Sequence, residues 1–187
     1  ITNTVTNMNA IETKLKGCFI LEPVVITDER GYFFEAFNDK KLEEILGFDP
    51  GFVQDNQSKS SYGVIRGLHL QKGEFAQAKL VRVLEGTVLD VAVDARPESE
   101  TFGQFVMVEL SAENKKQLLV PKGFAHGYSV LSETAEVFYK CDSFYNKESE
   151  GGISFKDPAL NINWHIPADK AIVSEKDLLY PGLDGCI

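Results

Sequence analysis

The sequence has little of what several classes of protein depend on. Its 187 residues include only three cysteines, an odd number that are widely spaced and form no CxxC pair. That pattern excludes a disulfide framework and a cysteine-based zinc site, and it favours reduced cysteines in the cytoplasm. No apolar run approaches the roughly 18 residues of a membrane-spanning helix. Residues 1–19 lack the basic and apolar regions of a signal peptide, and we interpret residues 1–7 as an upstream remnant ahead of Met8.

Positive charge is scarce as well. The chain has 19 basic and 28 acidic residues, a net charge of −9 and a pI near 4.9. This excess argues against nucleic acid or an anionic membrane as a partner. However, the segment Gln57–Val83 has five basic side chains against one acidic, a local net charge of +4. Two interpretations stay open for it: solvated strand edges, or a local anion pocket in which Arg binds phosphate bidentately.

Only one segment is predicted to form a helix. Asn38 suits an N-cap, Leu42, Ile45 and Leu46 share one helical face, and Gly47 is typical of a helix end. Most of the rest predicts short strands, many of them rich in aromatic and β-branched residues.

The predicted strands indicate a mainly β fold. They are Lys79–Leu84, Thr87–Asp94, Phe102–Leu110, Gln117–Val120, Gly127–Leu131 and Ala135–Cys141. Many short strands at regular spacing are typical of a sandwich or barrel, and we expect a double-stranded β-helix, a cupin-like jelly roll, with a few short helices. The tail after Gly151 is less regular. Since the chain has no repeat, low-complexity tract or linker, residues 1–187 are expected to form a single domain.

The second predicted strand has two distinct faces. Glu85-Gly86 before it is a hairpin signal. Val88, Asp90 and Ala92 alternate with purely apolar neighbours, so they share one face. We expect Asp90 to be an inward supporting acid and assign it no catalytic step.

Three histidines are the candidates for acid–base chemistry or metal binding. His69 lies inside the basic segment, where nearby cations favour the neutral imidazole that a general base needs; it is either catalytic or structural. His126 has glycines on both sides, which predicts a turn. The imidazole is then either hydrogen-bonded to the backbone or close to a ligand. His165 has no partner pattern and is expected to be structural. Because Gln71 stands two residues after His69, the paired histidines of a metal-binding cupin are absent, and no metal site is expected.

Five blocks of the sequence resemble the dTDP-4-dehydrorhamnose 3,5-epimerase family. They are DERGYFFEAF (28–37), FVQDNQSKSSYGVIRGLHLQ (52–71), AKLVRVLEGTVLDVAVDAR (78–96), PKGFAHGYSVLSETAEVFYK (121–140) and SEKD (174–177), in the family's order. The resemblance implies a cofactor-free jelly-roll epimerase, usually a homodimer, in deoxysugar biosynthesis. It would invert C3 and C5 of dTDP-4-dehydro-6-deoxy-D-glucose to give dTDP-4-dehydro-L-rhamnose.

The resemblance also assigns four catalytic residues. Protons on C3 and C5 flank the C4 ketone, so their removal gives an enolate, and inversion needs a base and an acid on opposite faces of the ring. By resemblance His69 is the base and Tyr139 the acid. Asp177 would orient the imidazole, and Lys79 would lie near the developing enolate oxygen.

The ligand contacts come from the same resemblance. They are Arg30, Glu35, Gln54, Asn56, Arg66, His126, Tyr145, Glu150 and Lys176. The two arginines are expected at the diphosphate, and Tyr145 is expected to stack on thymine. The amides of Gln54 and Asn56 would bind sugar or base, and the two glutamates would accept hydrogen bonds from the ligand. His126 is expected near the reacting sugar.

Two departures from the family pattern fall close to the expected base. Leu70 replaces a usual tyrosine, and Lys72-Gly73-Glu74 replaces a commonly proline-rich loop, so the rim near His69 is expected to differ. Other functions stay open from sequence alone: an epimerase that inverts only C3 or only C5, a non-catalytic carbohydrate-binding jelly roll, and a metal-dependent cupin oxygenase.

Overall fold

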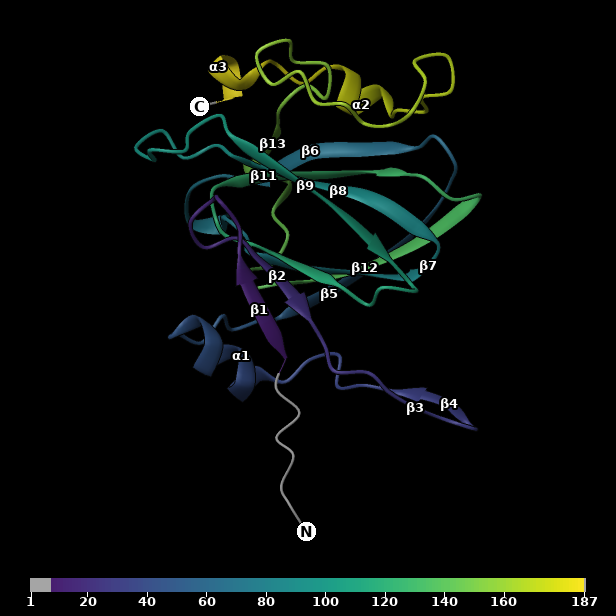
Figure 1. The fold of residues 1–187 in the computed structure, drawn as a ribbon. Coiled ribbons are helices and arrows are strands. Elements are labelled where there is room, and N and C mark those ends of the chain that lie inside the picture. The colour runs from purple at the N-terminus through teal and green to yellow at the C-terminus, as the bar shows by residue number, and fades with distance from the viewer. Residues whose placement is uncertain (1–7, 187) are drawn as a thin grey trace.

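The computed structural model describes residues 8–186 and consists mainly of two antiparallel sheets that face each other (Figure 1). The strands are β1 (Asn9–Glu12), β2 (Phe19–Glu22), β3 (Ile26–Asp28), β4 (Gly31–Phe33), β5 (Gln54–Ser61), β6 (Ile65–Gln71), β7 (Lys79–Glu85), β8 (Thr87–Asp94), β9 (Phe105–Ser111), β10 (Gln117–Val120), β11 (Phe124–Val130), β12 (Thr134–Cys141) and β13 (Glu150–Gly152). The helices are α1 (Asp39–Leu46), α2 (Glu175–Leu178) and α3 (Leu183–Cys186), with 3-10 turns at Gly73–Phe75 and Lys147–Ser149. The interpretation of residues 1–7 lies outside this range.

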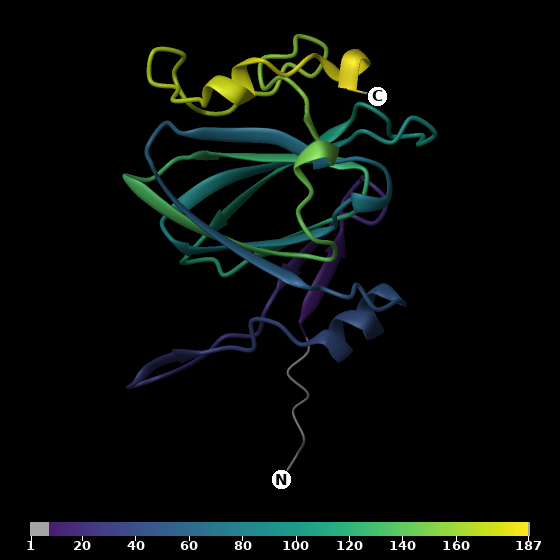
Figure 2. The ribbon, with the colours of Figure 1, turned by 180° about the vertical axis from the view of Figure 1, so that it is seen from behind.

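The strand order confirms the expected jelly roll. One sheet has six strands in the order β1-β2-β10-β7-β12-β5, and the other has five in the order β13-β6-β11-β8-β9. Strands β3 and β4 form a separate hairpin, which projects away from the sandwich in both views (Figures 1 and 2). Strand-rich composition, antiparallel pairing and three short helices all match the prediction.

Two local predictions within the sheets are wrong. Strands β7 and β8 do not form a hairpin at Glu85-Gly86: β7 pairs with β10 and β12, while β8 pairs with β9 and β11 in the opposite sheet. Both faces of β8 are apolar enough to be buried, so it lies inside a sheet covered on both sides. His126 is not in a turn either, because β11 begins at Phe124 and runs through it.

The central core fills the space between the sheets. Val81 and Val83 of β7 meet Val88 and Ala92 of β8 there. On the outer face of β8, Leu89, Val91 and Val93 belong to a second core. The alternation predicted for this strand is therefore confirmed, and both sets of side chains are buried.

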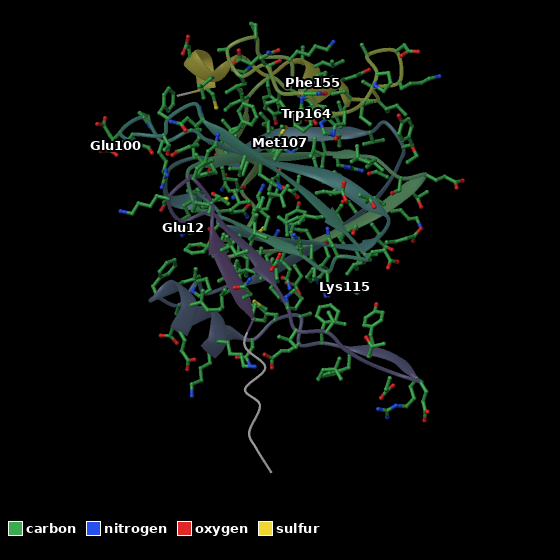
Figure 3. All side chains as sticks on the ribbon, in the orientation of Figure 1. Glu12, Glu100, Met107, Lys115, Phe155 and Trp164 are labelled. Carbon is green, nitrogen blue, oxygen red and sulfur yellow. The ribbon has the colours of Figure 1, made fainter. Side chains whose placement is uncertain are left out.

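The chain after β13 covers the outer face of the five-stranded sheet. It is irregular, as predicted, and it places Phe155 and Trp164 between itself and the sheet (Figure 3). The indole N–H of Trp164 donates to the Phe155 carbonyl at 2.8 Å, and the Trp164 carbonyl accepts from Ser129 Oγ at 2.7 Å. This tail, residues 153–186, is thus fixed to the sandwich by apolar burial and by hydrogen bonds.

Helix α1 covers part of the other sheet and begins and ends as predicted. The Asn38 side chain accepts from the backbone N–H of Lys41, and Gly47 adopts the left-handed conformation with φ of 77°. Leu42 is buried in a third core with Leu80 of β7. Within residues 8–186, no helix is long and apolar enough to cross a membrane.

Removing the Trp164 side chain should weaken the whole fold. Because this side chain is only 6% exposed, Trp164→Ala is expected to lower the free energy of unfolding by about 3–5 kcal/mol. Trp164→Phe should lose only about 1–2 kcal/mol, since a six-membered aromatic ring is retained and one hydrogen bond is lost. Urea unfolding followed by far-UV circular dichroism measures both, with Glu100→Ala on an exposed loop as the control. Equal losses in the two Trp164 variants would contradict this account.

Candidate active site

A cavity of about 250 Å³ opens between the two sheets at one end of the sandwich. It is lined by Gln54, Asn56, His69, Leu70, Gln71, Gln77, Lys79, Tyr139, Tyr145 and Glu150. Among them are the predicted base, acid and lysine, together with four of the predicted ligand contacts. A larger hollow of about 570 Å³ involves the tail and contains none of the predicted site residues.

The two sheets supply opposite walls of this cavity. His69 comes from β6 of the five-stranded sheet, whereas Lys79 and Tyr139 come from β7 and β12 of the six-stranded sheet. Lys79 lies directly opposite Cys141 in the β7–β12 pair, and Tyr139 is two residues from Cys141. Since side chains two apart on a strand share a face, Lys79 and Tyr139 both point to the cavity.

His69 is bound from behind by a carboxylate of the tail. Its Nε2 lies 2.7 Å from Oδ1 of Asp177, and Oδ2 of the same carboxylate accepts the Gly67 backbone N–H at 3.0 Å. Burial by itself raises the pKa of Asp177, but these hydrogen bonds outweigh it and the pKa is lowered. With Nε2 donating to an ionised carboxylate, the lone pair of neutral His69 is on Nδ1.

Burial affects the two groups on the other wall in opposite directions. It lowers the pKa of Lys79, against the attraction of nearby acidic groups that include Cys141 and Asp90. It raises the pKa of Tyr139 to about 12. The Lys79 Nζ lies 5.7 Å from the centre of the Tyr139 ring. Tyr139 therefore retains its proton at neutral pH beside a cation that can stabilise negative charge.

A hydrogen-bonded chain forms the rim of the cavity. Glu150 pairs with Lys176 at 2.5 Å and accepts from the Tyr145 hydroxyl at 2.9 Å. The Tyr145 backbone N–H donates to Gln54 Oε1, and the Gln54 amide donates to Asn56. Burial by itself raises the pKa of Glu150, but the hydrogen bonds from Lys176 and Tyr145 outweigh it and the pKa is lowered. The carboxylate is therefore ionised.

His126 lies beside His69 in the sheet that forms this wall, with its side chain on the inner face. It is opposite His69 in the β6–β11 pair, is 5% exposed, and does not line the cavity. Its Nε2 is 2.7 Å from Oδ1 of Asp90, which is fully buried. Asp90 is thus an inward acid that supports His126.

Besides His126 and the rim residue Lys176, three further predicted contacts do not line the cavity. Arg30 is at the tip of the projecting β3–β4 hairpin, where its exposed side chain pairs with Asp28. Glu35 pairs with Lys41 at 2.7 Å beside α1. Arg66 is exposed on β6 and donates to Ser60 Oγ at 3.0 Å.

The basic segment Gln57–Val83 does not form one anion pocket. Lys59 pairs with Glu85 on the surface at 2.8 Å, and Arg82 packs over Phe138 on the outer face of its sheet. Alternation along the strands thus places Lys59 and Arg82 on the outer face of the six-stranded sheet and Lys79 on its inner face. Lys79 alone of the segment's cations lines the cavity, while Arg66 is near enough for its charge to act on Tyr139, so only part of the segment's charge reaches the site.

Sequence reasoning missed Gln71, Gln77 and Tyr180. The first two follow the period of two from His69 and Lys79, a signal that identifies both as cavity residues. Tyr180 contacts the His69 ring, with centroids 5.8 Å apart and planes at 68°. It comes from the irregular tail, where no periodicity predicts its position. Over residues 8–186, no three His, Cys, Asp or Glu side chains are grouped closely enough to hold a metal ion.

Comparison with known proteins identifies the family. The sequence profile of the dTDP-4-dehydrorhamnose 3,5-epimerases matches residues 12–184. The chain belongs to this family. The dTDP-4-dehydrorhamnose 3,5-epimerase of Shigella flexneri is 53% identical over 171 residues, which cover 91% of this chain and 93% of that protein.

Solved structures of epimerases agree with this assignment. The dTDP-4-dehydrorhamnose 3,5-epimerase of Elizabethkingia anophelis is 61% identical with a TM-score of 0.92, covering 96% of this chain and 98% of its own. A dTDP-6-deoxy-D-glucose-3,5-epimerase of Legionella pneumophila, solved in complex with dTDP-4-keto-L-rhamnose, is 50% identical with a TM-score of 0.91, covering 95% of this chain and 93% of its own. The resemblance and the jelly-roll fold expected from it are confirmed.

Replacing Asp177 should reduce stability in a pH-dependent way. A carboxylate whose pKa is lowered on folding contributes stability that is present above its unfolded pKa and is lost as the pH falls through the folded pKa. Asp177→Asn is therefore expected to cost about 1–3 kcal/mol at pH 7, and this difference should shrink as the pH falls below about 4. Urea unfolding at several pH values measures it, with exposed Glu175→Gln as the control. If the difference in the free energy of unfolding stayed constant down to pH 2, an ionised Asp177 carboxylate bonded to His69 would be contradicted.

Proposed function

We propose that this chain inverts C3 and C5 of dTDP-4-dehydro-6-deoxy-D-glucose and releases dTDP-4-dehydro-L-rhamnose. The observation that carries the proposal is the placement of a histidine and a tyrosine on opposite walls of one cavity, with a buried lysine beside the tyrosine. A base and an acid on opposite sides of a sugar ring are what inversion at carbon requires. Membership of the 3,5-epimerase family supports the same reaction.

His69 begins each inversion. Its Nδ1 removes the proton from the carbon next to the ketone, and the electron pair of the C–H bond moves to the C4 oxygen as an enolate. Asp177 holds Nε2 and stabilises the imidazolium that forms. The Lys79 ammonium stabilises the charge on the enolate oxygen inside a site that burial has desolvated.

Tyr139 completes the inversion. Its hydroxyl gives a proton to the opposite face of the same carbon, and the ketone re-forms as the electron pair returns from oxygen. The step leaves an imidazolium and a phenolate, and proton exchange with water restores His69 and Tyr139. Repetition at the second carbon gives the doubly inverted product.

The rim is suited to the nucleotide. The Tyr145 ring is 54% exposed at the mouth of the cavity and offers a face for stacking on thymine. Lys176 offers a charge to the diphosphate once its bond to Glu150 is shared with the ligand. Gln54 and Asn56 present amides from β5 to the sugar or base.

We also infer a cytoplasmic homodimer of single-domain subunits. Ile26, Tyr32 and Phe33 of the β3–β4 hairpin are 51%, 61% and 70% exposed, and a second copy of the chain would cover them. That copy would also bring Arg30 and Glu35 towards a cavity that they do not line in their own chain. Cys18, Cys141 and Cys186 are free and buried, as suits a reducing compartment.

The tail packs on the sheet that carries His69, which supports one domain.

Deuterium incorporation tests the reaction directly. With dTDP-4-dehydro-6-deoxy-D-glucose in D₂O, the protein should place deuterium at both C3 and C5, because each inverted carbon receives its new proton from a solvent-exchanged group. NMR of the product measures the label at each carbon. Label at one carbon alone would identify a single-site epimerase, and no label or turnover would favour a carbohydrate-binding role.

The two proton-transfer residues should each be essential. His69→Asn and Tyr139→Phe are expected to lower kcat by about 10²-fold or more with the fold intact, since each removes one proton transfer. Steady-state turnover and circular dichroism measure these effects. His165→Asn and Tyr62→Phe, both at exposed positions, are the matched controls. Activity close to wild type in His69→Asn would overturn the assignment of the base.

A further inference from the structure

The segment Ser174–Tyr180 contacts the site through three side chains. Asp177 binds His69 Nε2, and Lys176 pairs with Glu150 at the rim. Tyr180 meets the His69 ring edge to face, at 5.8 Å between centroids and 68° between planes. Its hydroxyl is also near enough to Lys176 for the ammonium to oppose the rise that burial causes in the pKa of Tyr180. Tyr180 therefore contacts the expected base and lies near a group at the expected diphosphate end.

The position of the Tyr180 ring is closely defined by β13. Gly152 is opposite His69 in the β6–β13 pair, and a Cβ on Gly152 would lie 2.6 Å from two carbons of the Tyr180 ring. The ring thus lies against the backbone at the one position where the absence of a side chain leaves room for it. Burial is also the largest cause of the raised pKa of Tyr180, so the hydroxyl is neutral beside the Lys176 ammonium.

A single hydrogen bond does not fix an imidazole. The bond from Nε2 to Asp177 restrains the far end of the ring, but it leaves the ring plane free to tilt about the line through that nitrogen. An aromatic neighbour at an edge-to-face angle restrains that tilt, since such pairs prefer a defined interplanar geometry. The direction of the Nδ1 lone pair towards the cavity depends on the tilt, and catalytic groups need orientation within about 10–20°.

We propose that Tyr180 is a positioning residue that holds the imidazole plane of His69 through its ring and holds Lys176 through its hydroxyl. The inference rests on the proposed function, in which Nδ1 of His69 is the base. The two contacts use different parts of one side chain, so their effects are separable. The ring contributes to kcat because it aims the base, and the hydroxyl contributes to KM because it positions Lys176 for the diphosphate.

Three substitutions at one position separate the two contacts. Tyr180→Phe keeps the ring and loses the hydroxyl, so we expect kcat within twofold of wild type and KM raised about threefold. Tyr180→Leu and Tyr180→Met lose the ring as well, and we expect the same rise in KM with kcat lowered about tenfold. Leu179→Ala, a change at a neighbouring side chain that is 83% exposed, is the matched control. Circular dichroism melts identify variants that are folded, and Tyr180→Met serves if Tyr180→Leu is not.

An NMR measurement tests the positioning role without turnover. The Nε2–H of His69 should be protected from exchange in the wild type and in Tyr180→Phe, and it should exchange about tenfold faster in Tyr180→Leu or Tyr180→Met. Wild-type exchange and kcat in those two variants, or an equal loss of kcat in Tyr180→Phe, would overturn the proposal. If the wild-type protein does not epimerise the sugar nucleotide, the proposed function fails, while the exchange rates still decide whether Tyr180 restrains His69.

Discussion

Face-to-face packing of two sheets is the constraint on which the site depends. The sheets of a sandwich lie about 10 Å apart, so a ligand between them is reached by side chains from both sides. His69 projects from the five-stranded sheet, and Lys79 and Tyr139 project from the six-stranded sheet. The same packing buries all three to different extents, and burial adjusts their protonation. Burial disfavours the charged form of both Lys79 and Tyr139, whereas negative charge that develops on a ligand between them favours the ammonium form of Lys79 and the neutral form of Tyr139.

The second layer of the site is supplied by the tail. Asp177 is 108 residues from His69 in sequence, and it reaches His69 Nε2 because residues 153–186 are packed on the outer face of the five-stranded sheet. Burial of Phe155 and Trp164 thus contributes to acid–base geometry at a distance. The net charge of −9 is a property of the whole chain, whereas the site depends on one buried ammonium and on a carboxylate placed behind a histidine.

The features that the sequence predicted correctly are those determined by residues close together in the chain. The helix from Asn38 to Gly47 was predictable because its caps and its apolar face lie within ten residues of one another. Strand β10 was predicted to the residue, and the two faces of β8 were predicted from alternation. Pairing was not predictable in this way. The Glu85-Gly86 signal favours a hairpin, but β7 pairs with β10 and β12, whereas β8 pairs with β9 and β11 in the other sheet.

The same distinction between local and long-range features applies to the predicted site. The family resemblance predicted His69, Lys79, Tyr139 and the rim residues, and in the structure they lie at one cavity. Composition and spacing alone left two interpretations open for His69. The +4 segment was misleading because alternation along a strand sends neighbouring cations to opposite faces. The net charge of a sequence segment therefore does not give the charge at one place in the structure. Tyr180 could not be predicted at all, because its position depends on how an irregular tail packs against Gly152.

The location of the tail has a consequence for protein synthesis. A ribosome that has translated as far as Gly152 has already made every strand of the two sheets, including those that carry His69, Lys79 and Tyr139. The carboxylate that holds the imidazole, and the side chains of Lys176 and Tyr180, are translated later. Since domains commonly fold as units during translation and the tail shares a core with the five-stranded sheet, the sandwich and its acid–base pair are expected to form together once the tail has been made. The order of the sequence therefore delays assembly of the His69–Asp177 pair until the segment that follows the last strand has been made.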